Sequence, residues 1–576
     1  MKIFLNNNNP ISWELQKIAV IGPGIVGMPM AALLANAEIN LDGNGPAKVM
    51  VVQRNSKNSG WKVEAINQGK SVIGGIEPEL NAIVANAVSK GLLSATHNYA
   101  DLADADMILI CVQTDKKGFQ PDYGPLFEAL TCMAKALQKK PKNKVPVIVF
   151  ESTLAPSTMD SVIRVYLQKF GLIEGKNILL GNSPNRVMPG RLVERIRSSD
   201  KIVAGLHPET ARIIQKVYKH IVTEGQLFLT NSLTAEIVKT LENAYRDVRI
   251  AFSTEIVRYC DNQNLDFYYT RDKVNEMLSS EDNASKDPTS VPKGGMLIPT
   301  LGVGGHCLPK DGILLWWRKI ESGIDLSNSL ILKARKINNG SPDETIRLSE
   351  RKFGPFKNKK VAILGTAYRF NSEDTRNSPS LVLAKKLLKK GVQVILHDPY
   401  VKKDDQNLEK GNLHGLFTND LVIAVKESEY LFFATAHQEY LDKIERILHK
   451  SKNLKGIVDA SNLLDRATME STGISYTGIG RGVKKPDKEF IKFVFDSFRV
   501  MERGLSNEVV EIIQFLNEHY SSSPVNQAIF REVQTLASTC STGCDLADPG
   551  AVIFVPKYHG FIPSMAFDAV KHYCFA

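Results

Sequence analysis

Short apolar runs alternate with amphipathic stretches along the first part of the chain. Runs such as "IAVI", "MILICV" and "VIVF" are separated by stretches with helical periodicity up to about residue 228. Strands separated by helices pair in parallel, with helices on both faces of the sheet. The pattern therefore predicts a doubly wound α/β domain over residues 1–228.

The pattern then changes to one long helical period, in "TAEIVKTLENAYRDVRIAFSTEIVRYCDN". Thr234 is the expected N-cap of this helix, and Glu236 lies in its first turn. Lys239 and Asn243 are four residues apart and share a face of it. The apolar stripe comprises Ile237, Val238, Leu241, Ala244, Tyr245 and Val248. We expect a mainly helical domain over 229–344, including a polar loop at 279–295.

A second α/β pattern begins at "KKVAILGTAYRF" and continues through "VQVILHDPY", "EYLFFAT" and "LKGIVDASN". The predicted fold class is thus α/β, with two Rossmann-like doubly wound domains joined by a central helical domain that contains a long helix. The second Rossmann-like domain is placed at 345–483. Residues 484–576 form an extension that begins helical and whose role the sequence does not indicate.

Charge and composition narrow the class of protein. The 576 residues include 72 Lys and Arg against 62 Asp and Glu, a formal net charge of +10. This excess favours anionic ligands, but the basic residues are dispersed and match no nucleic-acid motif. No apolar run of membrane length and no export signal is present, so we expect a cytoplasmic protein without nucleic-acid or membrane partners.

Seven cysteines are scattered along the chain, a number and distribution that argue against a disulfide framework. In the final segment, cysteines and histidines could suggest a metal site, but their spacing matches no zinc pattern, and no metal is expected. The residues concerned are Cys540, Cys544, His559, His572 and Cys574.

A glycine-rich turn follows the first strand, in "IGPGIVGMPMA". Gly22, Gly24 and Gly27 form G-x-G-x-x-G between a predicted strand and a predicted helix. In that setting the glycines permit a tight turn, close approach of a pyrophosphate and close helix packing. We therefore predict a dinucleotide site.

The end of the next strand departs from the usual pattern for NAD. Gln53, followed by Arg54, stands where an acidic residue normally binds the adenosine ribose. NAD is the expected cofactor. NADP remains possible, because Arg54 could bind its 2′-phosphate.

Cys307 lies in "TLGVGGHCLPKD", after glycines that would let the backbone approach a ligand. Asp311 is four residues on, so both face the same way if a helix begins near the cysteine. A thiol near a helix N-terminus and a dinucleotide suggests covalent redox catalysis through a thiohemiacetal and a thioester. The residues alone leave a buried, inert cysteine as an equal alternative.

Several landmarks in order make the chain resemble the nucleotide-sugar 6-dehydrogenases, which include UDP-glucose and UDP-N-acetylmannosamine dehydrogenases. The similarity spans 17–483, and its further landmarks are "ESTLAPST", "SPNRVMPG", "AEIVKTLENAYRDV", "GVGGHCLPKD", "GTAYRFNSEDTRNSPS" and "YTGIGRG". The resemblance implies an NAD-binding domain, a central helix that builds a homodimer or higher homo-oligomer, and a UDP-binding domain. It also implies oxidation of C6 of the sugar to the acid with two NAD.

The resemblance assigns roles to residues of this chain. Cys307 would be the nucleophile, Lys239 would stabilise the oxyanion, and Asn243 would hold a water or the sugar oxygen. Asp311 resembles the base or water-orienting carboxylate, and Thr153 matches the active-site loop. The expected cofactor-binding residues are Gly22, Gly24, Ile25, Val26, Gly27, Gln53, Arg54, Thr114 and Thr153. The expected substrate-binding residues are Asn185, Arg186, Val187, Lys239, Asn243, Arg246, Gly304, Arg369 and Arg376.

Asn185 departs from the family, which has Glu at that place and associates it with water activation. An amide cannot act as a base at neutral pH, so another group such as Asp311 takes that role or hydrolysis is slow. The segments "SPNRVMPG" and "ARKINNG" resemble the N-acetylhexosamine branch. The predicted substrate is a UDP-N-acetylhexosamine, ManNAc or GlcNAc.

Other functions remain open at this stage. UDP-glucose is the alternative substrate of the same reaction. A two-electron dehydrogenase of the hydroxyacid type shares the N-terminal fold but needs neither Cys307 nor a second nucleotide domain. A catalytically weak protein that binds sugar nucleotides is the alternative from another class, supported by Asn185 and Gln53.

Overall fold

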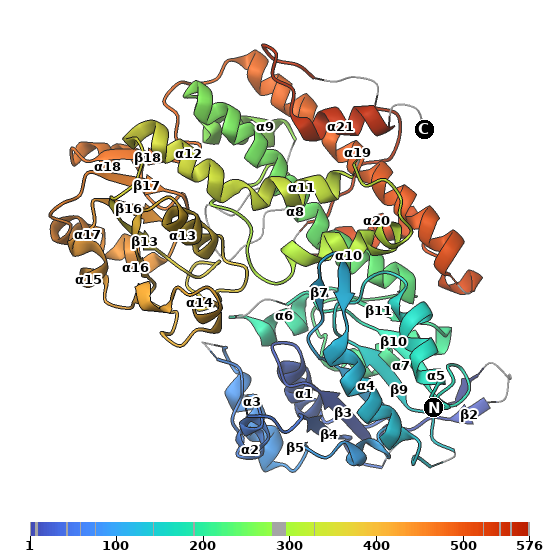
Figure 1. Cartoon of the computed structure of the whole chain (residues 1–576). Coiled ribbons are helices and arrows are strands. Elements are labelled where there is room, and N and C mark those ends of the chain that lie inside the picture. Colours follow the sequence, from blue (N-terminus) through green and yellow to red (C-terminus); the bar gives the residue numbers. More distant parts are fainter. Residues whose placement is uncertain are drawn as a thin grey trace. The chain divides into compact units, whose positions relative to one another are not determined.

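The fold is that of a computed structural model, which describes residues 2–5, 10–41, 44–57, 59–74, 77–141, 143–187, 190–278, 295–327, 329–521, 523–540, 543–552 and 556–573 (Figure 1). The predicted loop at 279–295 lies outside this range except for its last residue, as does Cys574. Contacts divide the chain into two compact units. The first comprises Met1–Glu242, Leu314–Ile324 and Val509–Asp545, and the second Asn243–Ile313, Asp325–Glu508 and Leu546–Ala576.

An eight-stranded sheet forms the centre of the first unit, in the order β12-β11-β10-β9-β6-β3-β4-β5. The expected strands β3, β4, β6 and β9 are all present, which confirms the predicted α/β class. The strands are β3 Lys17–Ile21, β4 Lys48–Val52, β5 Leu93–Thr96, β6 Met107–Ile110, β9 Val147–Phe150, β10 Leu179–Asn182, β11 Lys201–Gly205 and β12 Leu227–Asn231.

The pairing departs from an all-parallel sheet at one place. Strand β11 runs antiparallel to β10, with Gly181 opposite Gly205, and β12 then runs parallel to β11. Both glycines lie under α7. A Cβ at Gly205 would lie 2.6 Å from Thr210 Cβ, and a Cβ at Gly181 would lie 2.6 Å from Ala204 O. The close packing of α7 on these strands therefore requires glycine in both.

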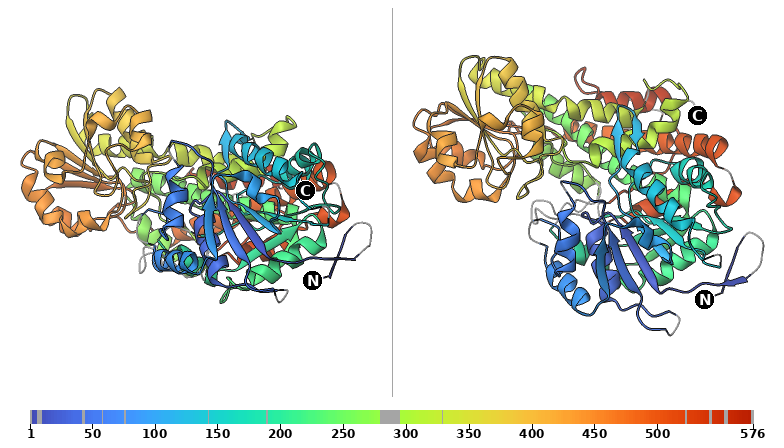
Figure 2. Two further views of the ribbon diagram at one scale, coloured as in Figure 1. Left: turned by 90° about the horizontal axis from the view of Figure 1, so that it is seen from below. Right: turned by 60° about the horizontal axis from the view of Figure 1, so that its bottom comes forward.

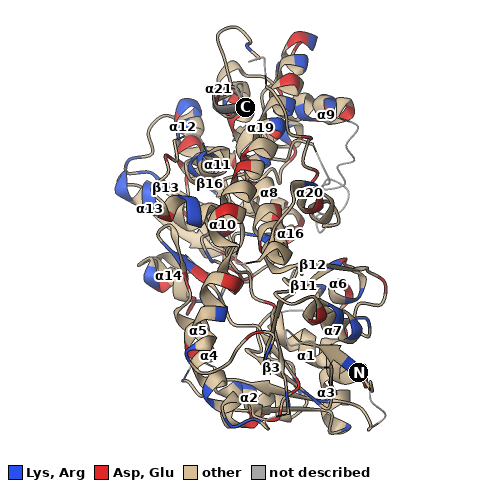
Figure 3. Cartoon of the chain, turned by 90° about the vertical axis from the view of Figure 1, so that its right-hand side faces the viewer, with Lys and Arg blue, Asp and Glu red and all other residues tan. Residues whose placement is uncertain are grey.

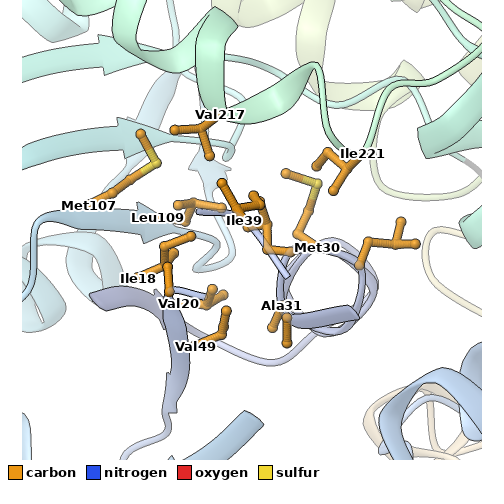
Figure 4. Close-up of a cluster of buried hydrophobic side chains, with 14 of the residues drawn as sticks. Ile18, Val20, Met30, Ala31, Ile39, Val49, Met107, Leu109, Val217 and Ile221 are labelled. Carbon is orange, nitrogen blue, oxygen red and sulfur yellow. The ribbon is translucent and has the colours of Figure 1, made fainter. Parts of the chain in front are cut away.

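Helices cover both faces of this sheet. Side chains of β3, β4 and β6, including Ile18, Val49 and Leu109, point toward Met30 of α1 and toward Val217 at the end of α7 (Figure 4). A second cluster covers the other face, mainly from α4. The helices are α1 Gly27–Asn36, α2 Trp61–Asn67, α3 Leu80–Ser89, α4 Gly124–Leu137, α5 Val165–Gln168, α6 Leu192–Ser198 and α7 Pro208–Tyr218. The hairpins are β1 Lys2–Phe4 with β2 Pro10–Ser12, and β7 Asp115–Lys117 with β8 Gln120–Asp122.

The second unit contains a six-stranded, fully parallel sheet in the order β15-β14-β13-β16-β17-β18, with helices on both faces (Figure 2). Its strands are β13 Lys360–Leu364, β14 Gln393–His397, β15 Phe417–Thr418, β16 Tyr430–Phe433, β17 Gly456–Asp459 and β18 Ser475–Gly478. Its helices are α13 Pro379–Lys389, α14 Gln406–Lys410, α15 Leu421–Lys426, α16 Gln438–Asp442, α17 Ile444–Lys450 and α18 Arg466–Ser471.

The predicted long helix is α8, Ser232–Gln263. Its start differs from the expectation, because the side chain of Asn231 accepts a hydrogen bond from Thr234 N at 2.9 Å. Asn231 therefore caps the helix and Thr234 lies inside it. Asparagine leads threonine as an N-cap. The other helices of the central segment are α9 Phe267–Met277, α10 Leu308–Glu321, α11 Leu330–Asn339 and α12 Ser341–Phe353.

The C-terminal extension, residues 484–576, contributes to both units. It consists mainly of α19 Lys488–Tyr520, followed by α20 Phe530–Ser538 and α21 Ser564–Tyr573. Every third or fourth residue of the first half of α19 is buried, including Phe490, Val494, Phe498, Met501 and Leu505. This period gives one apolar face to the helix.

Charged side chains of both signs are interspersed along the helices on the side that Figure 3 shows, in agreement with the dispersed pattern of the sequence. Among the described residues, no helix combines the length and hydropathy that crossing a bilayer requires.

Asp261, near the end of α8, should make the stability of the second unit depend on pH. Its carboxylate accepts a hydrogen bond from Gly480 N at 2.9 Å, and burial raises the pKa of Asp261 to about 7. Below the unfolded pKa near 4, the carboxyl is neutral in the folded and the unfolded state, and the full stability is present. Stability falls as the pH rises from there through 7. The loss is on the order of 1 kcal/mol per pH unit in that range.

Asp261→Asn keeps the acceptor and removes the ionisation, so we expect its Tm to rise relative to the wild type as the pH increases from about 4 to about 8. Thermal denaturation across that range measures the effect. Asp404→Asn, at an exposed position of the same unit, is the control. A constant difference in Tm between Asp261→Asn and the wild type at all pH values would contradict the assignment.

Candidate functional site

The glycine-rich turn between β3 and α1 has the geometry of a dinucleotide loop. Gly22 has φ of +93°, a conformation that L side chains rarely adopt, and a Cβ at Gly27 would lie 2.1 Å from Gly22 O. A Cβ at Gly24 would meet no atom within 4 Å, so this backbone is open on one side. Ile25 and Val26 complete the turn, and α1 begins at Gly27. The turn therefore presents the N-terminus of α1 to an anionic ligand, as a pyrophosphate site requires.

The segment after β4 bears on the choice of cofactor. The Gln53 amide donates to Ser59 Oγ at 2.9 Å and to Arg54 O at 3.2 Å, and the hydroxyls of Ser56 and Ser59 are 2.7 Å apart. Arg54 forms an ion pair with Glu128 at 2.8 Å, in which both side chains are more than half exposed. Exposed pairs of this kind contribute little, so Arg54 could exchange Glu128 for a phosphate at little cost.

The loop that contains Thr153 is fixed at both ends. Thr114 Oγ1 donates to Thr153 O at 2.7 Å. Farther along the loop, the carboxylate of Glu236, in the first turns of α8, accepts hydrogen bonds from Ser157 N and Met159 N, both at 2.8 Å. Burial raises the pKa of Glu236 well above its ordinary value. Glu236 therefore acts as the anchor between this loop and the start of α8.

Asn185 lies against a buried carboxylate that sequence reasoning did not single out. Its side-chain amide donates to Glu151, which also accepts from Lys201 Nζ at 2.9 Å and from the hydroxyl of Tyr218. Glu151 and Lys201 are almost fully buried, and burial lowers the pKa of Lys201. The first unit therefore does contain a carboxylate next to position 185. It belongs to Glu151, which follows β9, whereas the family pattern has the glutamate at position 185 itself, after β10.

Arg186, a predicted substrate residue, is held entirely by groups of the first unit in this structure. Its guanidinium pairs with Glu242 at 2.5 Å, and both side chains are buried. It also donates to Leu536 O at 3.0 Å and to Thr539 Oγ1 at 2.9 Å, in and just after α20 of the extension. The neighbouring Val187 packs on the apolar cluster beneath α1. These contacts give Arg186 a structural role, and its role toward substrate stays a prediction.

Cys307 immediately precedes α10, as the sequence analysis expects. Its carbonyl accepts from Lys310 N at 3.0 Å and Asp311 N at 2.9 Å, so it occupies the cap position of the helix. The residue is exposed. The alternative of a buried, inert cysteine therefore does not describe this residue, and its position beside the helix N-terminus favours the thiolate.

Behind the cysteine, Asp311 forms a buried polar cluster with α8. Its carboxylate accepts from the Asn243 amide at 2.6 Å and pairs with Lys310 Nζ at 2.9 Å, and Lys310 and Asp311 are almost fully inaccessible to solvent. Because Asn243 donates its amide hydrogen to Asp311, its side-chain oxygen is oriented away from that carboxylate. Lys239 lies one helical turn before Asn243 on α8, and both are partly buried, as is Arg246.

The glycines before Cys307 serve a purpose that the sequence did not predict. A Cβ at Gly304 would lie 2.5 Å from Tyr368 Cβ, and one at Gly305 would lie 2.8 Å from the Tyr368 ring. Gly305 N also donates to Arg376 O at 2.8 Å, and Asn377 donates to Gly305 O at 2.9 Å. The absence of side chains therefore lets this loop pack on the loop after β13, rather than only on a ligand as expected.

Arg369 and Arg376 thus belong to the same loop that holds the Cys307 segment. Arg376 forms an ion pair with Asp374 at 2.5 Å, and the Arg369 guanidinium lies 5.3 Å from the Phe370 ring centre. The turn between them is fixed by His437, whose Nδ1 accepts from Asn371 N at 2.8 Å and whose Nε2 donates to Asp398 at 3.1 Å. Two cations are therefore held on a defined loop at the carboxyl end of β13, where ligands of open α/β sheets bind.

The predicted residues divide between the two compact units. In the first unit, the carboxyl ends of the sheet strands are surrounded by the glycine turn, Gln53, Arg54, Thr114, Thr153, Asn185, Arg186 and Val187. Lys239 stands on α8. In the second unit, the start of α10 and the loop after β13 bring together Asn243, Gly304, Cys307, Asp311, Arg369 and Arg376, and Arg246 stands on α8. Sequence reasoning missed Glu151, Lys201, Lys310 and His437. Lys310 and Glu151 lie inside the quoted segments "LPKD" and "ESTLAPST", but nothing in the sequence shows what they contact.

Comparison with known families covers most of the chain. Models of the UDP-glucose/GDP-mannose dehydrogenase family match at residues 16–222 for its NAD-binding domain, 233–340 for its central domain and 362–466 for its UDP-binding domain. The three matches follow the order of the elements described above. The first contains the glycine turn, the second contains Cys307, and the third contains Arg369 and Arg376.

Individual relatives agree with these matches. A UDP-N-acetyl-D-mannosamine dehydrogenase of Pyrococcus horikoshii is 30% identical, over 81% of this chain and 99% of the relative, and one of Campylobacter jejuni is 27% identical, over 74% and 97%. The solved NDP-N-acetyl-D-galactosaminuronic acid dehydrogenase of Methanosarcina mazei is 30% identical, with a TM-score of 0.67, over 81% of this chain and 96% of that one. The chain belongs to the UDP-glucose/GDP-mannose dehydrogenase family.

Proposed function

We propose that this protein oxidises C6 of a UDP-N-acetylhexosamine, ManNAc or GlcNAc, from the alcohol to the uronic acid. The observation that carries the proposal is the exposed Cys307 at the start of α10, backed by the buried Asp311–Asn243 pair. The names of the relatives support an N-acetylhexosamine as substrate. UDP-glucose is the second candidate, because the family model includes enzymes that act on it.

The residues of the glycine turn, with Gln53, Arg54, Thr114 and Thr153, would hold the dinucleotide. The bound nicotinamide supplies the hydride acceptor for each of the two oxidations. The C6 alcohol would first lose a hydride and a proton to give the aldehyde. The sulfur of Cys307 would add to that aldehyde, and the resulting thiohemiacetal would lose a second hydride and a proton to give a thioester. A water molecule then cleaves the thioester to give the carboxylic acid and the free thiol. The four electrons removed account for two reduced cofactors per sugar.

Groups on α8 and α10 would stabilise this chemistry. Lys239 would supply a cation from a rigid helix to the negative charge that develops on the C6 oxygen, and stabilisation of such a charge is a large term in a closed site. Asn243, oriented by Asp311, offers its side-chain oxygen to a water or a sugar hydroxyl. Arg369 and Arg376 would bind the diphosphate, because guanidinium groups match phosphate oxygens in a bidentate way.

Substitution of Cys307 tests the covalent step. We expect Cys307→Ser to lower uronic acid formation by at least about a thousandfold, because a serine hydroxyl without an activating base is a poor nucleophile. The wild type should release two reduced cofactors per sugar consumed. Mass spectrometry of the sugar product and absorbance of the reduced nicotinamide measure both quantities.

Cys132→Ser, in α4 of the first unit, is the matched control and should leave both quantities unchanged. Uronic acid formation by Cys307→Ser at the rate of the control would reject the covalent mechanism. One reduced cofactor per sugar would indicate a two-electron dehydrogenase, and none would indicate a binding protein. Parallel assays with UDP-ManNAc, UDP-GlcNAc and UDP-glucose assign the sugar.

We further propose that NAD is the working cofactor and that NADP binds as well. Between Gln53 and Val63 the sequence contains Arg54, Lys57 and Lys62 but no acidic residue that would repel a 2′-phosphate. Gln53 retains a side-chain oxygen for a ribose hydroxyl, which supports NAD. Arg54 and the paired hydroxyls of Ser56 and Ser59 are donors that support NADP.

Substitution of Arg54 separates the two cofactors. We expect Arg54→Ala to weaken NADP binding by roughly tenfold and to leave NAD binding nearly unchanged, since a hydrogen bond to a charged group contributes about 1.5–3 kcal/mol. Titration of each dinucleotide in the absence of sugar, by calorimetry, gives the two values of Kd. Arg212→Ala, an exposed arginine that pairs with Glu209, is the control. Equal loss of NAD and NADP affinity in Arg54→Ala would contradict the assignment.

Asn185 and Glu151 should together control thioester hydrolysis. Asn185→Glu alone would place its carboxylate against Glu151, and two adjacent carboxylates resist joint ionisation. The double variant Asn185→Glu/Glu151→Gln exchanges the amide and the carboxylate and keeps the hydrogen bond between them. It moves the carboxylate to the position where the family has a base.

We expect the double variant to hydrolyse the thioester faster than the wild type, and Asn185→Glu alone to gain less. A general base typically contributes about 10²–10⁴-fold, which sets the upper range of the gain. Single-turnover release of the acid, after rapid mixing with the UDP-sugar, measures the hydrolysis step. Glu151→Gln alone controls for the loss of the contact to Lys201. An unchanged hydrolysis rate in the double variant would show that Asn185 does not limit this step.

A further inference from the structure

The C-terminal extension lies outside the part of the chain that its relatives share. The last family match ends at residue 466. The Pyrococcus horikoshii relative is matched over 99% of its own length by 81% of this chain, so about a fifth of this chain has no counterpart there. Val509–Asp545 of the extension belongs to the first unit, as do the end of α10, Leu314–Ile324, and the loop that contains Thr153. The contacts within this unit indicate a role for this part of the extension.

The loop after β9 is buried beyond Thr153. Residues 154–160 are all buried, whereas Thr153 is partly exposed. Ser157 has φ of +74°, a left-handed conformation that a residue with a side chain keeps only where its surroundings hold it. The chain continues as a π-helix, Met159–Arg164, a rare form that is frequent at functional sites. The shape of this loop is therefore imposed by its neighbours.

Arg318 of α10 contacts this strained part of the loop. Its Nε donates to Ser157 Oγ at 2.8 Å, its Nη2 to Ser161 Oγ at 2.5 Å, and its Nη1 to Glu321 at 2.7 Å. The Ser161 hydroxyl in turn donates to Ser157 O at 2.7 Å. All three nitrogens of the guanidinium are thus engaged, and two of them hold the residue with the left-handed backbone and the π-helix that follows it.

The extension contributes an aromatic ring to the surroundings of Arg318. The central carbon of the guanidinium lies 3.8 Å from the ring centre of Trp317 and 4.3 Å from that of Tyr520, the last residue of α19. The side chain of Arg318 is only 10% exposed. Attraction between a guanidinium and an aromatic face strengthens where water is excluded. Tyr520 therefore restricts the positions that this guanidinium can take.

A second residue of the extension holds the end of the same loop. Asn526, shortly after α19, donates to Asp160 Oδ2 at 3.3 Å and accepts from Leu233 N at 3.0 Å, in the first turn of α8. Asn526 and Asp160 are both buried. Asp160 also accepts from Arg164 Nε at 2.6 Å, within the π-helix. One side chain of the extension thus joins the π-helix to the start of α8.

We propose that Arg318, held by Tyr520 of the extension, is a positioning residue for the loop that presents Thr153 to the dinucleotide. The inference rests on the proposed dinucleotide site, but not on the identity of the sugar or on the chemistry of Cys307. A loop that is held in its binding shape beforehand loses no affinity to ordering when the ligand arrives. The extension thereby raises the affinity of the first unit for its cofactor.

Two substitutions of Tyr520 test the proposal. Tyr520→Leu removes the aromatic face and keeps an apolar side chain, whereas Tyr520→Phe keeps the face and is the matched control. We expect Tyr520→Leu to raise the Kd for NAD roughly tenfold at an unchanged number of binding sites, because the cofactor must then order a freer loop. Tyr520→Phe should bind NAD as the wild type does. Calorimetric titration without sugar gives both the Kd and the number of sites.

Hydrogen exchange in peptides that span residues 154–161 shows whether the loop itself responds. We expect faster exchange in Tyr520→Leu and in Arg318→Lys, because an ammonium lacks the planar face and the fixed fork of a guanidinium. Lys319→Met is a further control, because Lys319 also joins α10 to α19 but pairs with Glu511 at 3.3 Å rather than with the loop. It should leave the Kd for NAD and the exchange of the loop unchanged.

Failure of this inference and failure of the proposed function give different results. A wild-type protein that binds neither NAD nor NADP would overturn the dinucleotide site and this inference with it. If the wild type binds NAD, an unchanged Kd or unchanged exchange of the loop in Tyr520→Leu and Arg318→Lys would overturn this inference alone. A variant that merely unfolds in part would show fewer binding sites with the Kd of the wild type, and that result would also reject a positioning role.

Discussion

The burial of α8 is the constraint on which the rest of the structure depends. A helix with so little solvent exposure must satisfy its polar side chains within the protein, because an unpaired buried charge costs several kcal/mol. Glu236 does so with the amides of Ser157 and Met159, Asn243 with Asp311, and Asp247 with Arg335 and Asn338. These partners come from the loop after β9, from α10 and from α11. Within the first unit, Glu236 thus fixes the loop after β9, and within the second unit Asn243 and Asp247 fix the start of α10 and the helix α11.

Elements with a clear period could be predicted from the sequence. The strands β3, β4, β6 and β9 are short runs of buried apolar residues, and α8 shows a helical period over its whole length. The position of Cys307 before a helix follows from local spacing alone. The N-cap of α8 was misplaced because Asn231 and Thr234 both fit that role, and only the bond from Thr234 N to Asn231 decides between them. The reversal of β11 could not be predicted, because the direction of a strand leaves no trace in its apolar pattern.

The candidate site shows the same limit at a finer scale. Residue types that carry chemistry can be recognised from motifs, but the partners that orient them are distant in sequence. Glu151 and Asn185 lie at the ends of two different strands and are 34 residues apart in the sequence. Asn243 and Asp311 are 68 residues apart. Nothing at position 185 indicates that its amide donates to a carboxylate that is also paired with a buried lysine. The glycines before Cys307 show the opposite case. The sequence indicated that glycine was required there, but it did not show that the group these glycines approach is Tyr368.

Residues of the C-terminal extension cover the second-unit part of α8, where Phe498 of α19 packs on Phe252 and Glu255 accepts from Met565 N of α21 at 3.0 Å. Association between copies depends on protein concentration, whereas a segment joined by covalent bonds faces its site at a fixed effective concentration. The tether here is short, because Gly480, two residues after β18, already donates to Asp261 of α8, and α19 begins at Lys488. Closing this short loop therefore costs little conformational entropy. The part of α8 in the second unit, which carries Asn243, therefore keeps this cover at any dilution.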